Sequence, residues 1–187
     1  MAVIYGKRIR LRAIERDDLP AFVKWINNPE VRQGLGIYLP FSQADEEDWF
    51  DTNRSRPIEE HNLAIEARPP GVREDVPASE GWKLIGSCGF FNVDHRNRSS
   101  EFGIMIGDQG YWDQGYGTEA VRLLIQHGFN TLNLNRIFLR VFTNNPRAIH
   151  SYEKAGFVLE VRQRQAEFRD GKYIDLLVMS VLKDEFQ

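Results

Sequence analysis

The stretch Gly110-Tyr111-Trp112-Asp113-Gln114-Gly115-Tyr116-Gly117-Thr118-Glu119-Ala120 decides how this chain is interpreted. An apolar run over residues 102–106 precedes it, and apolar residues at helical spacing follow it. Three glycines therefore lie in a turn between a predicted strand and a predicted helix, where they permit positive φ and close approach to the backbone. Because a helix begins with unpaired N–H groups and partial positive charge, the stretch predicts a phosphate or pyrophosphate site formed by the main chain.

Two other phosphate-binding motifs fit this stretch less well. Gly110 and Gly115 have P-loop spacing, but Tyr116-Gly117 stand where that loop needs lysine and serine or threonine. Residues 115–120 also match Gly-x-Gly-x-x-Ala, the dinucleotide fingerprint. That motif needs glycines directly after the strand and an acid at the end of the next strand, and here the next apolar run ends in Thr143-Asn144-Asn145. A nicotinamide cofactor is therefore the weaker alternative.

Residues 112–117 resemble the acyl-CoA-binding signature of the GNAT N-acetyltransferase family, Gln/Arg-x-x-Gly-x-Gly/Ala. They match at Gly115 and Gly117 and depart at Trp112, which replaces the polar residue. Residues 145–157 resemble the second family signature, Asn-x-x-Ala…Tyr-x-Lys-x-Gly-Phe. Residues 9–19 resemble the opening strand and helix of the branch that holds ribosomal-protein alanine and spermidine N-acetyltransferases. The resemblance covers nearly the whole chain, with both signatures in the expected order.

The resemblance implies an acetyl-CoA site made largely from backbone amides. The amides from Gln114 to Thr118 would hold the pyrophosphate. A bulged strand over residues 101–107 would direct amides near Met105, Ile106 and Gly107 toward the thioester, as oxyanion donors. The expected cofactor-binding residues are Met105, Ile106, Gly107, Trp112, Gln114, Gly115, Tyr116, Gly117, Thr118 and Asn145.

Three side chains have a functional and a structural interpretation. Tyr152 matches the family's general acid, which would protonate the leaving sulfur, and it could equally be a packed aromatic on its helix. Glu101 matches a general base in several family members, or is an exposed carboxylate at a strand end. Asn145 would contact the pantetheine arm, cap the helix that Pro146 opens, or do both.

The acceptor follows only in outline. The thioester needs an amine nucleophile, and we expect either a small polyamine-like molecule or the N-terminal α-amine of a protein, with aminosugars also open. An acidic wall near the second helix would attract a cationic amine, although such a charge run is more often a solvated helix face. Its members are Asp45, Glu46, Glu47, Asp48, Asp51, Glu59 and Glu60. A non-catalytic acyl-CoA sensor on the same fold is the alternative function.

Composition bounds the setting. The chain has 187 residues, suits one domain over 1–187, and carries a net charge of −3, which argues against a nucleic-acid partner. No apolar run approaches the ~18 residues of a membrane span. The single cysteine, Cys88, excludes an intramolecular disulfide and makes a reducing cytoplasm the simplest location. The four histidines lack metal-ligand spacing, so no metal is expected, whereas exposed strand edges could support a homodimer.

The order of predicted elements is βααβββαβαββ. It indicates an α/β (α+β) fold with a mixed, mostly antiparallel central sheet flanked by helices, as in the GNAT fold. The predicted strands cover residues 7–13, 62–67, 84–93, 99–106, 137–142, 158–168 and 173–182. The predicted helices cover residues 17–27, 42–54, 116–131 and 146–154. Asn28-Pro29 is expected to end the first helix, and residues 68–81 are expected to form a loop.

Overall fold

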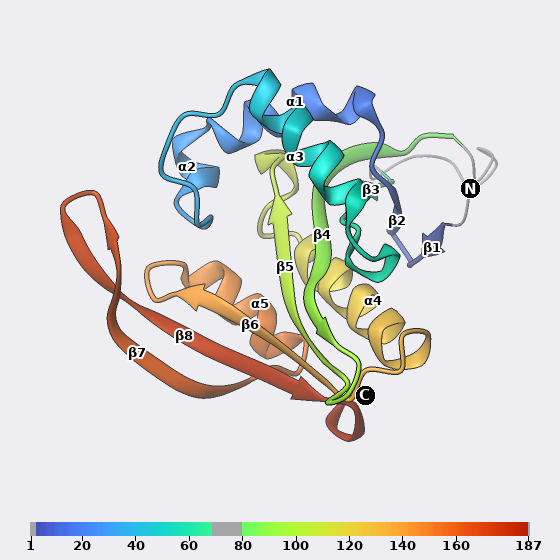
Figure 1. The fold of residues 1–187 in the computed structure, drawn as a ribbon, viewed down its shortest axis with the longest axis vertical. Coiled ribbons are helices and arrows are strands. Elements are labelled where there is room, and N and C mark those ends of the chain that lie inside the picture. The colour runs from blue at the N-terminus through green and yellow to red at the C-terminus, as the bar shows by residue number, and fades with distance from the viewer. Residues whose placement is uncertain (1–2, 69–79, 187) are drawn as a thin grey trace.

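A computed structural model describes residues 3–68 and 80–186 of the chain. Within this part a single sheet has eight strands in the order β1-β2-β3-β4-β5-β6-β8-β7 (Figure 1). The strands are β1 Ile4–Tyr5, β2 Ile9–Ala13, β3 Leu63–Ala67, β4 Lys83–Asp94, β5 Ser99–Ile106, β6 Arg136–Phe142, β7 Val158–Arg169 and β8 Lys172–Leu182. The α-helices are α1 Leu19–Ile26, α2 Pro29–Arg32, α3 Gln43–Ser55, α4 Tyr116–Asn130 and α5 Pro146–Lys154.

The described sheet is mixed and mostly antiparallel, as the sequence predicted. Its neighbouring strands run antiparallel except for β5 and β6, which are parallel. This pattern differs from the mostly parallel sheet of dinucleotide-binding folds, so the nicotinamide alternative is dropped. No helix in the described ranges combines the length and the apolar character needed to cross a membrane.

Two apolar cores lie on opposite faces of the sheet, because successive side chains of a strand point to opposite sides. Ile65 packs in the core that α4 and α5 cover, whereas its neighbour Ala64 packs in the core beneath α1 and α3. In the same way Ile106 contacts the first core and Met105 the second. The end of β5 therefore contributes side chains to both halves of the molecule.

The sheet opens between β5 and β6. In the described structure their register comprises three pairs, from Ser99 opposite Arg136 to Glu101 opposite Phe138. Beyond this point the two strands separate, and α5 lies behind the gap (Figure 1). The β5 backbone after Glu101 therefore borders an opening on this side, and its polar groups there are available to a ligand.

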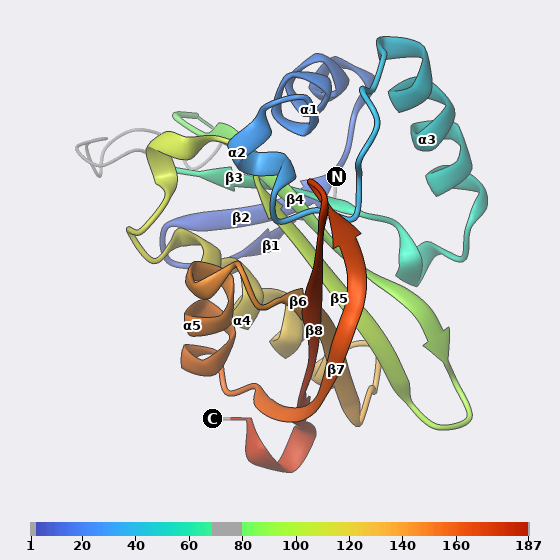
Figure 2. The ribbon, with the colours of Figure 1, turned by 90° about the vertical axis from the view of Figure 1, so that its left-hand side faces the viewer.

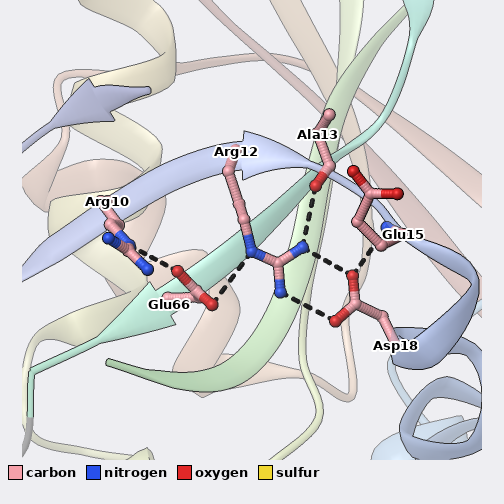
Figure 3. A network of polar contacts seen from close by, with 6 residues as sticks. All are labelled: Arg10, Arg12, Ala13, Glu15, Asp18 and Glu66. Carbon is pink, nitrogen blue, oxygen red and sulfur yellow. Dashed lines mark hydrogen bonds and ion pairs between the residues drawn. The ribbon is translucent and has the colours of Figure 1, made fainter. Parts of the chain in front are cut away.

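The turn from β2 into α1 is fixed by a buried polar network (Figure 3). Arg12 binds both carboxylate oxygens of Asp18, at 2.6 and 2.8 Å, and Glu66 accepts from both Arg10 and Arg12. The Glu15 N–H donates to Asp18 Oδ2 at 2.8 Å, which closes the first turn. The side-chain hydrogen bond between Arg12 and Asp18 is the main cause that raises the pKa of Arg12. Since Asp18 and Glu66 are each only 7% exposed, this pairing is what makes their burial tolerable, and it sets the direction in which α1 leaves the sheet.

Local sequence signals predicted most elements well. The bounds of α5 agree with the prediction, and those of α3 and α4 agree within one residue. Two elements were missed. The strand β1 has only two residues, and Pro29 opens the short helix α2 instead of ending α1. Asn28 caps that helix by accepting from the Glu30 N–H, so Asn-Pro here acts as a start signal. Most of the loop predicted over 68–81 lies outside the described residues.

Candidate active site

A cleft of about 600 Å³ occupies the opening between β5 and β6. Its walls come from α2 and the loop after it, the end of β5, the segment leading into α4, and α5. Eight of the predicted site residues line it together: Met105, Ile106, Trp112, Gly115, Gly117, Thr118, Asn145 and Tyr152. Four others, Glu101, Gly107, Gln114 and Tyr116, are not in its lining. Residues from distant parts of the sequence thus meet in one place.

The N-terminus of α4 faces this cleft without a side-chain cap. Gly115 occupies the N-cap position with φ +82°, a left-handed conformation that favours glycine. The first helical bond runs from the Glu119 N–H to the Gly115 carbonyl, so the amides of Tyr116, Gly117 and Thr118 have no partner within the helix. These amides form a positive site suited to a phosphate group.

Gly117 leaves room for such a ligand. A Cβ placed there would lie 3.6 Å from Ile106 and 3.8 Å from Ser151, which are ordinary contact distances. The protein itself therefore does not require glycine at this position. The missing side chain keeps the backbone of the first helical turn accessible from the cleft.

Helix α5 adds polar and cationic groups to the cleft. Thr118 Oγ1 and Ser151 Oγ lie 2.7 Å apart and join the two helices. Arg147, Ser151 and Lys154 all line the cleft, and their spacing puts them on one face of α5. The sequence analysis missed Arg147 and Lys154, although this helical spacing behind Asn145 could have revealed them.

Trp112, the departure from the family signature, has a definite role in this structure. Its indole N–H donates to the Ile106 carbonyl at 2.7 Å. The Arg147 guanidinium stacks on its ring, 3.4 Å from the ring centre. Trp112 thereby links the end of β5 to the first turn of α5, and it orients a cation at the mouth of the cleft.

The prediction for the Gly107 amide was wrong. Its N–H donates to the Ile85 carbonyl at 2.9 Å and is therefore engaged with β4 instead of the cleft. A Cβ at this position would lie 2.1 Å from the Trp25 ring, so the glycine allows α1 to pack against the sheet. Met105 and Ile106, which were predicted together with it, do border the cleft, and Ile104 of the same strand borders it too.

Gln114 and Tyr116 are held by Arg8. The Arg8 side chain donates to the Gln114 carbonyl at 3.2 Å, and its guanidinium lies over the Tyr116 ring at 4.4 Å. Tyr116 is buried, and the Gln114 side chain donates to the Gly110 carbonyl at 2.6 Å. Their side chains thus support the loop, and only their backbone amides stay available for the role that was predicted.

Tyr152 lies at the inner end of the cleft among aromatic side chains. Its ring meets Phe102 and Phe157 edge-on, with centres 6.3 and 5.8 Å away. Burial raises the pKa of the Tyr152 hydroxyl above its usual value near 10. The hydroxyl therefore keeps its proton at neutral pH and is equipped to donate that proton to a developing anion in the cleft.

Glu101 forms an ion pair at the point where β5 and β6 separate. Its Oε1 accepts from Arg140 Nε at 2.8 Å, and the bond raises the pKa of Arg140. Arg140 lines the cleft whereas Glu101 does not. The pair joins residues 39 positions apart, and the sequence analysis did not anticipate Arg140.

Asn145 caps α5, as one of its two interpretations predicted. Its side-chain oxygen accepts from the Ala148 N–H at 3.2 Å. The side-chain nitrogen faces the loop after α2, since a Cβ at Gly34 would lie 2.8 Å from it. Asn145 also lines the cleft, so the capping bond leaves its amide group at the ligand-facing surface.

The acidic residues predicted near the second helix do not line this cleft. Asp45 bonds Ser42 in the cap of α3, Asp51 pairs with Arg16 at 2.6 Å, and Glu59 lies 2.9 Å from His95. None of the acidic residues in that set lines the cleft, whose described lining has Glu30 and Asp113 as its acidic members. The structural interpretation of this charge run therefore holds. Across residues 3–68 and 80–186 no group of histidine, cysteine and acidic side chains is arranged to hold a metal ion.

Comparison with known proteins supports the assignment that this geometry suggests. A family model described as an acetyltransferase (GNAT) domain matches residues 8–158. The chain is 31% identical, over its whole length, to the uncharacterized N-acetyltransferase p20 of Bacillus licheniformis, of which it covers 99%. It is 27% identical to the spermidine N(1)-acetyltransferase of Vibrio cholerae, with 97% of this chain and 96% of that protein covered.

Solved structures agree with the sequence comparison. The crystal structure of spermidine N-acetyltransferase from Vibrio cholerae in complex with CoA and spermine matches with a TM-score of 0.81 and 26% identity. The match covers 96% of this chain and 98% of that one. The chain therefore belongs to the GNAT acetyltransferase family, and it is an enzyme that transfers an acetyl group to an amine.

Proposed function

We propose that this chain, acting as a single domain, transfers the acetyl group of acetyl-CoA directly to a primary amine of a small molecule. The observation that carries the proposal is the cleft in which the uncapped N-terminus of α4 and the hydroxyl-bearing Tyr152 lie at the opening between β5 and β6. The first feature suits a diphosphate, and the second suits a leaving thiolate. One continuous sheet through the described residues supports a single domain.

The residues divide the binding task along the cleft. The amides of Tyr116, Gly117 and Thr118 would hold the pyrophosphate, with Arg147 and Lys154 beside them as cations. The backbone that borders the opening between β5 and β6 would receive the pantetheine arm, because there the parallel strand pairing has ended. The acetyl group would then lie between Met105, Ile106 and Tyr152.

The chemistry needs three proton and charge events. The neutral amine attacks the thioester carbon, and the oxyanion that forms accepts a hydrogen bond from the Ile106 amide. The carbon–sulfur bond then breaks, and Tyr152 donates its proton to the departing thiolate. The amine gives up a proton to water or to Glu101, which would have to leave its ion pair with Arg140 to accept it.

The acceptor is the finer part of the proposal. Relatives named spermidine N(1)-acetyltransferase, and the matching structure in complex with CoA and spermine, support a small polyamine-like amine over the N-terminus of a protein. Because the acidic residues near α3 do not line the cleft, other small amines also remain open as acceptors. The single cysteine, Cys88, is a buried free thiol, which fits the reducing cytoplasm where we propose that the enzyme acts.

A homodimer through β7 is a further part of the proposal. β7 is the edge strand of the described sheet, and Val158, Leu159 and Val161 on it are exposed. An exposed apolar edge strand is a surface that a second copy can pair with. Sedimentation of the purified protein tests this, and a monomer at all concentrations would contradict it.

Release of free CoA tests the activity. The protein is mixed with acetyl-CoA and with polyamines, amino-terminal peptides or aminosugars, and the thiol that appears is measured. We expect turnover with small amines. Binding of acetyl-CoA without turnover on any amine would instead identify an acyl-CoA sensor and overturn the proposal.

Tyr152→Phe tests the mechanism. The ring stays in its aromatic cluster while the donated proton is lost, so kcat should fall about tenfold or more, with acetyl-CoA affinity unchanged. Tyr173→Phe, at an exposed position on β8, is the matched control and should leave kcat unaltered. Unchanged turnover in Tyr152→Phe would remove this residue from the mechanism.

A further inference from the structure

Arg169, at the end of β7, forms hydrogen bonds with a segment more than 130 residues before it in the chain. Its guanidinium donates to the carbonyls of Arg32 and Gln33, at 3.2 and 3.3 Å, and also to the carbonyl of Leu35. It stacks on the Phe142 ring as well, 4.3 Å from the ring centre. One planar side chain thus satisfies three carbonyls at and just beyond the C-terminus of α2, where helical carbonyls lack partners of their own.

This contact is unusual for the strand that provides it. Along most of its length β7 is exposed and pairs with β8 alone, and Arg169 is one of its few residues that is not fully exposed. The turn end of the β7–β8 hairpin rises to the C-terminus of α2 (Figure 2). Arg169 is therefore the point at which the outer hairpin is joined to the opposite side of the cleft.

The segment that Arg169 holds, residues 28–35, lines the cleft. Gln33, Gly34 and Leu35 contribute to its wall. Leu35 also packs in the same apolar core as Met105, beneath α1 and α3. The position of these residues therefore decides how much space remains beside the acetyl end of the cleft.

Besides the core packing of Leu35, polar contacts hold this segment on the side away from Arg169. The Gln109 side chain, just before α4, donates to Glu30 and lies 3.4 Å from the Asn28 side chain. Near the start of α5, Asn145 fits closely against Gly34. Both attachments lie toward the N-termini of α4 and α5, where the phosphates would bind. Arg169 holds the segment at its other end, through the carbonyls of Arg32, Gln33 and Leu35.

We propose that Arg169 is a positioning residue for the acceptor: it fixes Gln33, Gly34 and Leu35 as the wall of the amine site and so sets affinity for the amine. The inference rests on the proposed function, because it names a determinant of the acceptor half of that same cleft. Arg169 acts through the carbonyls that it binds. Acetyl-CoA affinity depends on the opposite end and should be nearly independent of it.

Two substitutions separate the charge from the fork-shaped hydrogen bonding. Arg169→Met keeps an apolar stem over Phe142 and removes every bond to the three carbonyls. Arg169→Lys keeps the charge, but a single ammonium cannot reproduce the planar fork. Arg164→Met is the matched control, since Arg164 is an exposed residue of the same strand.

Steady-state kinetics with the best amine gives the first readout. In Arg169→Met the KM for the amine should rise roughly tenfold, while the KM for acetyl-CoA changes less than about twofold. Arg169→Lys should fall between this variant and the parent protein, and Arg164→Met should match the parent. Equal amine KM in Arg169→Met and the parent, or an equal rise in both KM values, would overturn the proposal.

Hydrogen exchange gives a readout that needs no activity. The amides of Gln33, Gly34 and Leu35 donate to Pro29, Val31 and Arg32 carbonyls, so a peptide over residues 29–36 reports on the segment. This peptide should exchange faster in Arg169→Met than in Arg164→Met. Unchanged exchange would show that Arg169 does not fix residues 33–35, even if the parent enzyme acetylates no amine tested. Absent turnover with faster exchange would reject the proposed function alone.

Discussion

The N-termini of α3 and α4 differ in what binds the unpaired N–H groups of their first turn. At α3, Ser42 accepts from the Asp45 N–H and Asp45 returns a bond to the Ser42 N–H at 2.8 Å, so the chain satisfies its own helix start. At α4, Gly115 offers no side chain, and the first amides face the cleft instead. A self-satisfied start leaves nothing for a ligand, whereas the uncapped start is suited to an anion.

The contrast shows how differently charged residues and glycines act at a helix start. The acids at the start of α3 stabilise their own helix, and they lie outside the cleft. The glycines before α4 have no side-chain chemistry, yet they leave the binding groups of the main chain uncovered. The signal for the proposed phosphate site is the absence of side chains at a helix start.

The largest expected effect comes from filling the uncapped start. Gly117→Leu should weaken acetyl-CoA binding about 100-fold, or roughly 2.7 kcal/mol, because the side chain would cover amides meant for the pyrophosphate. Calorimetric titration with acetyl-CoA measures the change. Folding should survive, since a Cβ at this position meets only ordinary contacts.

Ala44→Leu is the matched control for this variant. Ala44 holds the same second position in α3 that Gly117 holds in α4, and it is exposed. Its acetyl-CoA affinity should equal that of the parent. Comparable loss in both variants, or no loss in Gly117→Leu, would contradict the proposed difference between the two helix starts.

Glu46 of α3 gives an effect on stability instead of binding. It is 3% exposed, and burial raises its pKa to about 7. In the unfolded chain the pKa of this carboxyl group is about 4.5, so the folded protein binds its proton more tightly than the unfolded chain does. The stability that protonated Glu46 contributes is therefore complete below about pH 4.5 and is lost as pH rises through 7. Glu46→Gln should therefore stabilise the protein by about 2 kcal/mol at pH 8.

Urea unfolding at two pH values checks this prediction. The gain in free energy of unfolding should be present at pH 8 and should nearly vanish at pH 4. Glu47→Gln, on an exposed neighbour in the same helix, should show no such dependence. A gain that is equal at both pH values would show that ionisation of Glu46 is not its cause.

The smallest expected effect is at the capped start itself. Ser42→Ala removes the acceptor for the Asp45 N–H and should cost about 1 kcal/mol in the free energy of unfolding. Acetyl-CoA affinity should stay the same, because α3 does not reach the cleft lining. A loss of cofactor affinity in this variant would show that the two helix starts are not independent.

Sequence reasoning succeeded where the deciding signal was local. Asn145-Pro146 predicted the start of α5, and Asp170-Gly171 predicted the turn between β7 and β8. The glycines around Gly115 predicted the uncapped start of α4. The two family signatures, at residues 112–117 and 145–157, together predicted many of the residues that line the cleft. In each case a few neighbouring residues determine the geometry.

It failed where the partner comes from a distant part of the chain. The Gly107 amide binds Ile85 because of how β4 and β5 pair, and no pattern near Gly107 reveals that register. The bond between Glu101 and Arg140 depends in the same way on where two strands separate. Arg169 contacts residues 134 to 137 positions away, so only the fold itself could reveal it.

The short pairing between β5 and β6 has a consequence for how the family can diversify. Past the three register pairs seen in the described residues, main-chain bonds of fixed length no longer set the separation of the two strands. Next to this opening, Phe102 of β5 packs against Tyr152 of α5 and against Phe157, so side-chain packing joins β5 to α5 there. Side-chain volume can change by substitution without any alteration of the backbone ladder. We therefore expect substitutions among these apolar residues to change the space beside the proposed acetyl site.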